Sequence, residues 1–89
     1  MAHHNLKTWP KYFWDVVRGE KEFEVRKDDR NFAVGDTIQL QEWSPEIAQF
    51  TGSHCNAEVV YKLNGGQFGI ADGYCVLGLR VDEPFELEE

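Results

Sequence analysis

The sequence predicts an α+β fold in which one N-terminal helix packs against a strongly curled antiparallel sheet. Apolar residues recur at helical spacing in residues 8–18, and later segments show the two-residue alternation of strands. These strands follow one another at hairpin spacing in a chain of only 89 residues. A closed or nearly closed β-barrel is the simplest such arrangement, because closure removes exposed strand edges.

The composition indicates one acidic domain, residues 1–89, with an acidic tail, 82–89, that we expect to fray. The net charge is −7, yet residues 1–30 hold seven of the nine Lys and Arg. Residues 31–89 hold ten of the sixteen Asp and Glu. Binding of a long duplex needs many neutralised phosphates, so the charge favours a nucleotide or a short single strand at a local basic pocket.

Several classes of protein are not expected. No apolar run approaches the roughly 20 residues of a membrane span, and the N-terminus lacks the pattern of a secretory signal, so we expect a cytoplasmic protein. Cys55 and Cys75 are then expected to be reduced, buried thiols. Together with His54 they show no metal-ligand spacing, so we expect no metal and no cofactor.

The predicted helix spans residues 8–18 and follows a short first strand at the N-terminus. Thr8 is a suitable N-cap, and Pro10 suits the first turn of a helix. Trp9 and Phe13 begin the apolar stripe, which continues at helical spacing. Gly19 is a natural stop, since glycine readily adopts a left-handed conformation.

The next strand, residues 22–27, carries an unusual set of charges. Alternation places Phe23 on one face and places Glu24 and Arg26 on the other. The charged row is either a ladder of surface ion pairs or the floor of a polar pocket. Spacing alone favours the ladder, whereas the pocket predicts that Arg26→Ala loses ligand with little change in melting temperature.

Alternation and turn residues predict the remaining elements. The further strands are residues 37–43, 57–63 and 74–81, with a hairpin corner at 50–53. The last of these strands is almost uniformly apolar, which is typical of a central strand covered on both faces. Glycines punctuate the loop 64–73, which is either a plain hairpin connection or a lid over a ligand.

The charged strand resembles a known signature. Gly19-x-Lys21-x-x-Glu24-x-Arg26 is similar to the G-x-K-x-x-E-x-R motif of the ASCH domain in the PUA-like superfamily. The resemblance covers about residues 4–80, over which the chain is similar to a small bacterial and phage subfamily of ASCH-like proteins of unassigned function. It also rests on His4-x-Leu6-Lys7-x-x-Pro10-x-x-Phe13, Asp29-Arg30-x-Phe32-x-Val34-Gly35-Asp36, Gly65-Gly66-x-Phe68-Gly69-Ile70 and Gly73-Tyr74-x-Val76-Leu77-Gly78.

The resemblance implies a small PUA-like (ASCH) antiparallel β-barrel with a cleft beside the signature strand. It also implies that the domain binds single-stranded RNA, a nucleotide or a modified nucleoside. In this interpretation Lys21, Glu24 and Arg26 form the floor of the cleft, and His4 and Lys7 lie at its rim. Phe68, in the glycine-rich loop, is a further candidate for stacking on a base.

Two alternatives stay open. Some ASCH proteins hydrolyse the amide of N4-acetylcytidine with a lysine at the position of Lys21, but they carry threonine where this chain has Glu24. If the protein is an enzyme, Lys21 is the nucleophile or base and Glu24 carries or orients the proton. The second alternative is a protein-interaction adaptor that uses an exposed Trp43. The oligomeric state, monomer or weak dimer, is not fixed by the sequence.

Overall fold

The computed structural model describes residues 1–82, so all of the acidic tail except Asp82 lies outside the described part of the chain. The described residues form one helix and one five-stranded sheet. The elements are β1 (His3–Thr8), α1 (Pro10–Val17), β2 (Phe23–Lys27), β3 (Thr37–Ser44), β4 (Gln49–Asn64) and β5 (Tyr74–Val81).

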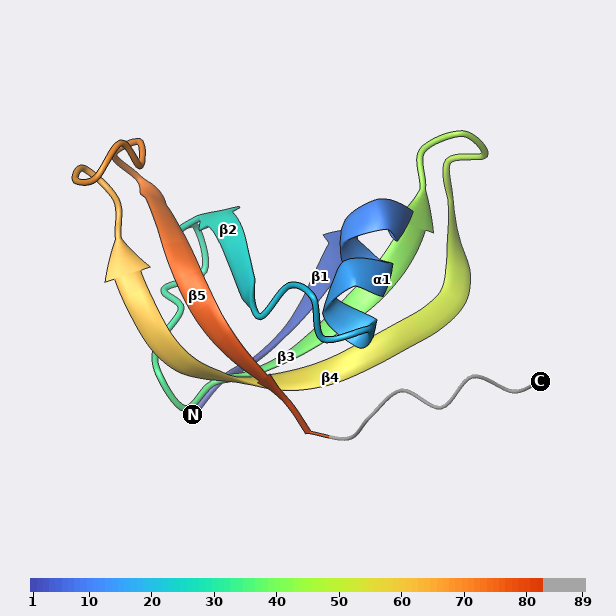
Figure 1. Ribbon diagram of the computed structural model, residues 1–89, viewed down its shortest axis with the longest axis horizontal. Helices are drawn as coiled ribbons and strands as arrows, with labels where there is room; N and C mark the ends of the chain where they lie inside the picture. The colour runs from blue at the N-terminus through green and yellow to red at the C-terminus, as the bar shows by residue number, and fades with distance from the viewer. Residues whose placement is uncertain (83–89) are drawn as a thin grey trace.

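The sheet has the strand order β1-β3-β4-β5-β2 and curls into a half-barrel with the shape of a U, with α1 inside it (Figure 1). The expected α+β fold with one N-terminal helix is therefore confirmed in outline. The expectation of an all-antiparallel sheet is wrong, since β1 pairs with β3 in parallel. The chain from β1 to β3 passes through α1 and β2, and a connection of this kind permits parallel pairing where a hairpin does not.

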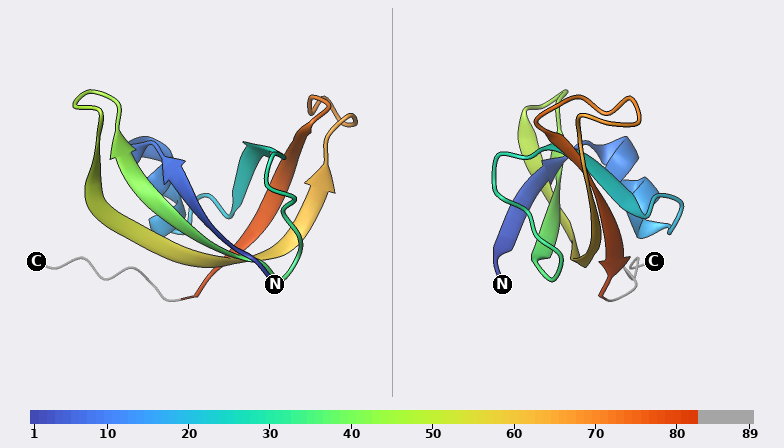
Figure 2. Two further views of the ribbon diagram at one scale, coloured as in Figure 1. Left: turned by 180° about the vertical axis from the view of Figure 1, so that it is seen from behind. Right: turned by 90° about the vertical axis from the view of Figure 1, so that its left-hand side faces the viewer.

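The sheet does not close into a barrel. β1 and β2 are the two ends of the strand order, and no backbone pairing joins them within residues 1–82. The left-hand view of Figure 2 shows from the opposite side that the two strands stand apart. We expected a closed or nearly closed barrel, but the described residues form an open half-barrel. The candidate functional site lies at its open side.

The long strand β4 runs around the base of the U and pairs with β3 and then with β5 (Figure 1). The predicted strand 57–63 is only its last part. The predicted hairpin corner at 50–53 is wrong, because the turn lies at residues 45–48. Gly52 lies inside strand β4 and has a left-handed φ of 97°. This backbone conformation accompanies a shift in the register between β3 and β4 and does not form a turn.

The hydrophobic core lies on the concave side of the sheet. Phe13 and Val16 of α1 are at most 1% exposed and pack against the inward residues of the strands. Trp14 packs partly buried against this core, whereas Trp9 is 54% exposed, so one tryptophan of the helix is internal and the other faces solvent. The strand residues of the core include Leu6, Ile38, Leu40, Cys55, Ala57, Val59, Cys75, Leu77 and Leu79.

Two details of the predicted elements need correction. Helix α1 begins at Pro10 with Trp9 as its N-cap and no side-chain capping bond, because Thr8 is the buried last residue of β1. Strand β5 is not covered on both faces, since Tyr74 on its outer face is 44% exposed. Gly19 ends the helical segment with a φ of 78°, as predicted.

Both cysteines are free and buried, as the sequence predicts. Within the described residues, no helix is both long enough and apolar enough to cross a membrane.

Candidate functional site: a basic cleft at the open side of the half-barrel

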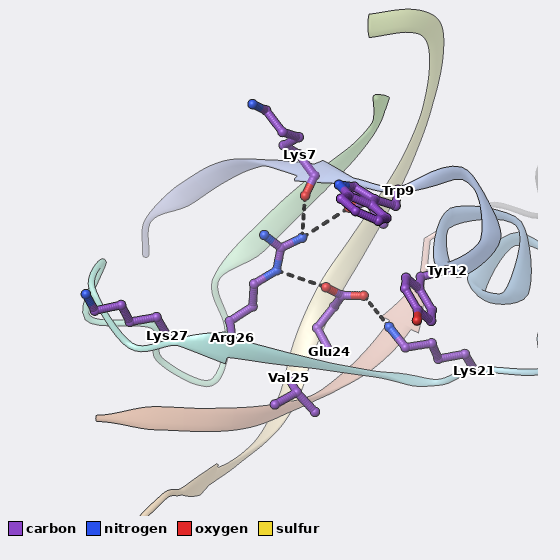
Figure 3. Close-up of a pocket in the computed structure, with 9 residues that line it drawn as sticks. Lys7, Trp9, Tyr12, Lys21, Glu24, Val25, Arg26 and Lys27 are labelled. Atoms are coloured by element: carbon purple, nitrogen blue, oxygen red, sulfur yellow. Dashed lines mark hydrogen bonds and ion pairs between the residues drawn. The ribbon is translucent and has the colours of Figure 1, made fainter. Parts of the chain in front are cut away.

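A cleft of about 460 Å³ opens between β2 and the segment that joins β1 to α1 (Figure 3). It therefore lies where the sheet fails to close. Its lining combines basic, hydroxyl and aromatic side chains with one carboxylate: Lys7, Thr8, Trp9, Tyr12, Lys21, Glu24, Val25, Arg26 and Lys27.

Strand β2 places Glu24 and Arg26 on the inner face of the U. Glu24 is only 3% exposed, whereas Phe23 and Val25 are 45% and 52% exposed on the outer face. The predicted alternation is confirmed, with the unusual result that the polar side chains point inward. An inward polar row is stable only if its members bond one another, since an unpaired buried carboxylate is costly.

The carboxylate of Glu24 is held between two cations. Its Oε1 atom lies 2.5 Å from Nζ of Lys21, and its Oε2 atom accepts a hydrogen bond of 2.9 Å from Nε of Arg26. The side chains of Lys21 and Arg26 are 17% and 24% exposed. Two partly buried cations against one carboxylate leave the floor of the cleft with a net positive charge.

Arg26 also crosses the open side of the sheet. Its Nη2 atom donates to the carbonyl oxygen of Lys7 at 2.7 Å and to Oγ1 of Thr8 at 3.1 Å. Arg30 makes a second crossing, from Nη1 to the carbonyl oxygen of Asn5 at 2.9 Å. Two arginine side chains thus donate hydrogen bonds to the carbonyl oxygens of Asn5 and Lys7 on β1. In a closed barrel, backbone hydrogen bonds from a neighbouring strand would occupy these positions.

Aromatic side chains form the other wall of the cleft. Trp9 and Tyr12 are 54% and 49% exposed at the start of α1, so much of each ring is accessible. Nζ of Lys21 lies 5.6 Å from the ring centroid of Tyr12, within the range of a cation–π contact. The sequence did not single out Tyr12 or Thr8 for the site, because helical periodicity assigned Tyr12 to the apolar stripe and capping preference assigned Thr8 to the helix.

The structure brings Lys21, Glu24 and Arg26 together but does not place His4 with them. His4 is buried on β1, and its Nε2 atom lies 2.9 Å from Oδ2 of Asp36. Its ring also makes an edge contact with Phe32, at 4.7 Å between centroids. The hydrogen bond from His4 holds the pKa of Asp36 below its ordinary value, although burial opposes it, and backbone N–H groups of Ala2 and Ala33 add to the lowering. His4 therefore belongs to a buried bonded pair that is not part of the cleft lining.

Lys7 and Phe68 lie differently from the predicted arrangement. Lys7 presents its carbonyl oxygen to Arg26, while its side chain points away from the cleft in Figure 3. Its Nζ atom lies 4.3 Å from the centroid of the Trp43 ring. Phe68 is 82% exposed at a left-handed φ of 53° in the loop 64–73, and it is not among the residues that line the cleft.

The cleft offers donors and aromatic surface rather than metal ligands. Among the described residues, no group of three or more His, Cys, Asp or Glu is arranged to hold a metal ion. Lys21 and Arg26 are suited to an anionic oxygen, and Trp9 and Tyr12 to a planar ring. A ligand with both an anionic group and a planar ring would match this lining.

Fold and cleft together define a small α+β domain, a half-barrel with a basic cleft at its open side. Residues 3–79 match the family described as Domain of unknown function (DUF3850), and the chain belongs to this family. A curated relative is an "Uncharacterized 12.9 kDa protein in GpA 3'region" of Escherichia phage P2, which is 43% identical over 56 residues. That match covers 63% of this chain and 50% of the relative, so it spans half the length of the phage protein.

Proposed function

We propose that this domain is a binding module that holds a nucleotide, a modified nucleoside or a short single-stranded RNA in the cleft beside β2. The observation that carries the proposal is the Lys21–Glu24–Arg26 network next to the exposed rings of Trp9 and Tyr12. The resemblance of the β2 signature to ASCH domains supports it, and on that basis we propose a PUA-like relationship for the fold.

The charge distribution supports an anionic ligand at this one place. The protein carries a net charge of −7, yet the floor of the cleft holds the two cations of Lys21 and Arg26 against the one carboxylate of Glu24. The local field would attract a phosphate group, whereas the acidic remainder would repel a long polyanion. The expected ligand is therefore small or single-stranded.

The bonding of Arg26 indicates which donor is left for a ligand. Its hydrogen bonds within residues 1–82 use Nε and Nη2. A guanidinium has five N–H donors, so the two on Nη1 are available to a phosphate or a base edge. Lys21 adds a point charge on the other side of Glu24, and the carboxylate fixes the positions of both cations.

The aromatic wall supports recognition of a base. Single-stranded nucleic acids are commonly bound by stacking unpaired bases on aromatic rings beside a basic groove. Trp9 and Tyr12 are exposed on the cleft side at the start of α1, so a base could stack without moving a core residue.

A matched pair of aromatic variants tests the proposal. Trp9 in the cleft and Phe50 on β4, outside it, are each 54% exposed. We expect Trp9→Ala to weaken binding of nucleoside monophosphates and RNA tetranucleotides by roughly 5- to 100-fold, as is usual for the loss of one stacking contact. Phe50→Ala should retain wild-type affinity, measured by calorimetry or NMR titration. Equal loss in both variants, or no binding by the wild-type protein, would contradict the proposal.

A second pair of variants tests the cations and the loop separately. Lys21→Gln should weaken binding and reduce its dependence on salt concentration, because one neutralised phosphate contact is lost. Phe68→Ala decides whether the loop takes part. Unchanged affinity would show that Phe68 does not contact the ligand. Reduced affinity would indicate that the loop 64–73 lies over the bound ligand.

The close contact between Nζ of Lys21 and Oε1 of Glu24 favours one alternative, hydrolysis of an acylated nucleoside. Glu24 would accept a proton from the ammonium group of Lys21, and the neutral amine would then take a proton from water as that water attacks the acetyl carbonyl. Breakage of the C–N bond would follow, with Lys21 returning the proton to the departing amino group, so that the products are acetate and the free nucleoside. This alternative predicts acetate release from N4-acetylcytidine and its loss in Lys21→Ala. Binding without any acetate release would leave only the binding module.

We also propose a cytoplasmic location. The two buried, unpaired cysteine thiols are compatible with a reducing compartment. Fusion of the chain to a fluorescent protein, followed by cell fractionation, would test this.

A further inference from the structure

The outer edge of β1 faces the open side of the half-barrel. Strand β1 is one end of the strand order, so no strand in the described part of the chain pairs with this edge. Instead, Nη2 of Arg26 donates to the carbonyl oxygen of Lys7 at 2.7 Å (Figure 3). Nη1 of Arg30 donates to the carbonyl oxygen of Asn5 at 2.9 Å. We call the strip formed by these four residues the β1 edge.

The β1 edge has unused donors, whereas its acceptors are engaged. The N–H and C=O groups of one strand residue point to the same side, so the N–H groups of Asn5 and Lys7 also face this edge. Within residues 1–82, Arg30 bonds only through Nη1, which leaves its Nε and Nη2 atoms free. Nη1 of Arg26 is free in the same sense. A ligand on this edge therefore meets two backbone donors and two guanidinium groups.

This set of groups suits a phosphodiester backbone better than a peptide. A peptide that adds to a sheet edge must donate to the carbonyl groups of the edge as well as accept from its N–H groups. On β1 the carbonyl oxygens of Asn5 and Lys7 already accept from arginine, and the guanidinium groups lie where the added strand would donate. A phosphodiester offers only acceptor oxygens and a negative charge, which guanidinium and N–H donors bind well.

The two guanidinium groups are spaced for two neighbouring phosphates. Asn5 and Lys7 are two positions apart on β1, so their carbonyl groups lie about 6–7 Å apart. The arginine nitrogens lie 2.9 and 2.7 Å from these carbonyl oxygens, so the guanidinium groups are a similar distance apart. Neighbouring phosphates along one extended nucleic-acid strand have a comparable separation. The β1 edge can therefore hold one phosphate at each arginine.

The charges next to Arg30 do not cancel this attraction. Asp28 is neutralised by Lys62, whose Nζ atom donates to its Oδ2 atom at 2.7 Å. Asp29 is exposed and forms no ion pair within residues 1–82, but Lys27 and Arg30 are exposed on either side of it and also lack an acidic partner there. The turn after β2 thus adds positive charge to the end of the β1 edge that lies beyond the cleft lining.

We propose that the β1 edge carries a second phosphate site, so that the ligand is a single-stranded oligonucleotide with one phosphate at Arg26 and the next at Arg30. This inference rests on the proposed function and narrows its three ligand classes to one. A base would stack on Trp9 or Tyr12 in the cleft, and the strand would leave the cleft along β1 towards Asn5. Arg30 then determines specificity, because a ligand with a single phosphate at Arg26 does not reach it.

A length series with the wild-type protein tests the proposal without any variant. The probes are a uridine dinucleotide, which has a single phosphodiester, and a uridine tetranucleotide. We expect the tetranucleotide to bind at least tenfold more tightly, with a slope of log affinity against log salt that is steeper by about 0.7 for the added phosphate contact. A tetranucleotide with uncharged methylphosphonate linkages should lose this gain. If the dinucleotide binds and the tetranucleotide binds no better, the cleft stands and the second site is wrong; if neither binds, both proposals are wrong.

A matched pair of arginine variants assigns the second site. Arg30→Gln should lower the ratio of tetranucleotide to dinucleotide affinity at least fivefold. Arg80→Gln removes another exposed arginine, on β5 and outside the cleft lining, and should keep the wild-type ratio. The backbone N–H signals of Asn5 and Lys7 should shift in NMR spectra on addition of the tetranucleotide. An unchanged ratio in Arg30→Gln would overturn the proposal. So would shifts of these signals with an extended peptide but not with the tetranucleotide, because the edge would then bind a strand of protein.

Discussion

The Nη2 atom of Arg26 lies 2.7 Å from the carbonyl oxygen of Lys7, so a side chain of β2 holds the backbone of β1 across the open side of the sheet. The same guanidinium donates from Nε to the buried carboxylate of Glu24. Arg26 thus joins the two edges of the half-barrel and forms the floor of the cleft. The ligand-cleft interpretation of the sequence predicted a change of affinity alone on its removal, and the structure alters that prediction.

Arg26→Ala should destabilise the fold as well as weaken ligand binding. The variant loses both contacts to β1 and leaves Glu24 with Lys21 as its remaining cation, which we expect to cost about 2–4 kcal/mol. Urea unfolding would measure the loss. Arg80→Ala is the control, because its ion pair is 67% exposed on the Arg80 side and should be worth less than about 1 kcal/mol. Equal effects of the two substitutions would show that Arg26 does not join the edges.

The buried pair of His4 and Asp36 predicts a particular loss of stability in acid. The pKa of Asp36 is lowered in the folded protein, chiefly by the hydrogen bond from His4. Its contribution is therefore fully present above the ordinary value of 3.8 and is lost as the pH falls through the lowered pKa. The difference in unfolding free energy between wild type and Asp36→Asn should shrink below about pH 4. A constant difference down to about pH 2 would show that the carboxylate is not stabilised in its charged form.

Both cysteines should resist thiol reagents in the native state. Burial raises the pKa of the Cys55 and Cys75 thiols, and nearby carboxylates raise them further. The thiolate is the reactive form, so little of it is present at neutral pH. A chromogenic disulfide reagent should react slowly with folded protein and with both thiols after unfolding in urea. Rapid reaction of one thiol in the native state would indicate local opening of its strand.

Gly65 should not tolerate a side chain. A Cβ atom at this position would lie 2.1 Å from the carbonyl oxygen of Ala71 and 2.5 Å from that of Tyr74. Gly65→Ala must therefore shift the loop and weaken the bond from Gly65 N–H to Tyr74 O, which we expect to lower the melting temperature by several degrees. Gly69→Ala is the comparison, because it meets no atom within 4 Å and carries only the cost of its φ of 78°. A larger loss in Gly69→Ala would contradict the steric explanation.

The local part of the fold could be predicted from the sequence because it depends on neighbouring residues. Pro10 and Gly19 mark the helix, and alternation in residues 23–27 separates Glu24 and Arg26 from Phe23. The sequence also predicts that Lys21 lies close to Glu24 and Arg26, because all three lie within six positions of one another.

The rest of the fold and of the candidate site depends on which strands, distant in the sequence, become neighbours in the sheet. Periodicity carries no information on whether β1 pairs in parallel, or on which strands form the ends of the sheet. The contact of Arg26 with Lys7 and Thr8, eighteen or more residues away, follows only from that topology. For the same reason the sequence placed His4 at the rim of the cleft, whereas in the structure His4 bonds to Asp36, 32 positions away.

The position of β4 has a consequence for the order of folding. It forms hairpins with β3 and β5, its neighbours in the sequence, so these contacts close short loops and cost little entropy. The pairings of β1 with β3 and of β2 with β5 span far longer stretches of chain. We therefore expect the three-stranded meander to form first and the two outer strands to dock last. The cleft would then be absent from any folding intermediate, and a bound ligand would slow unfolding at its first step.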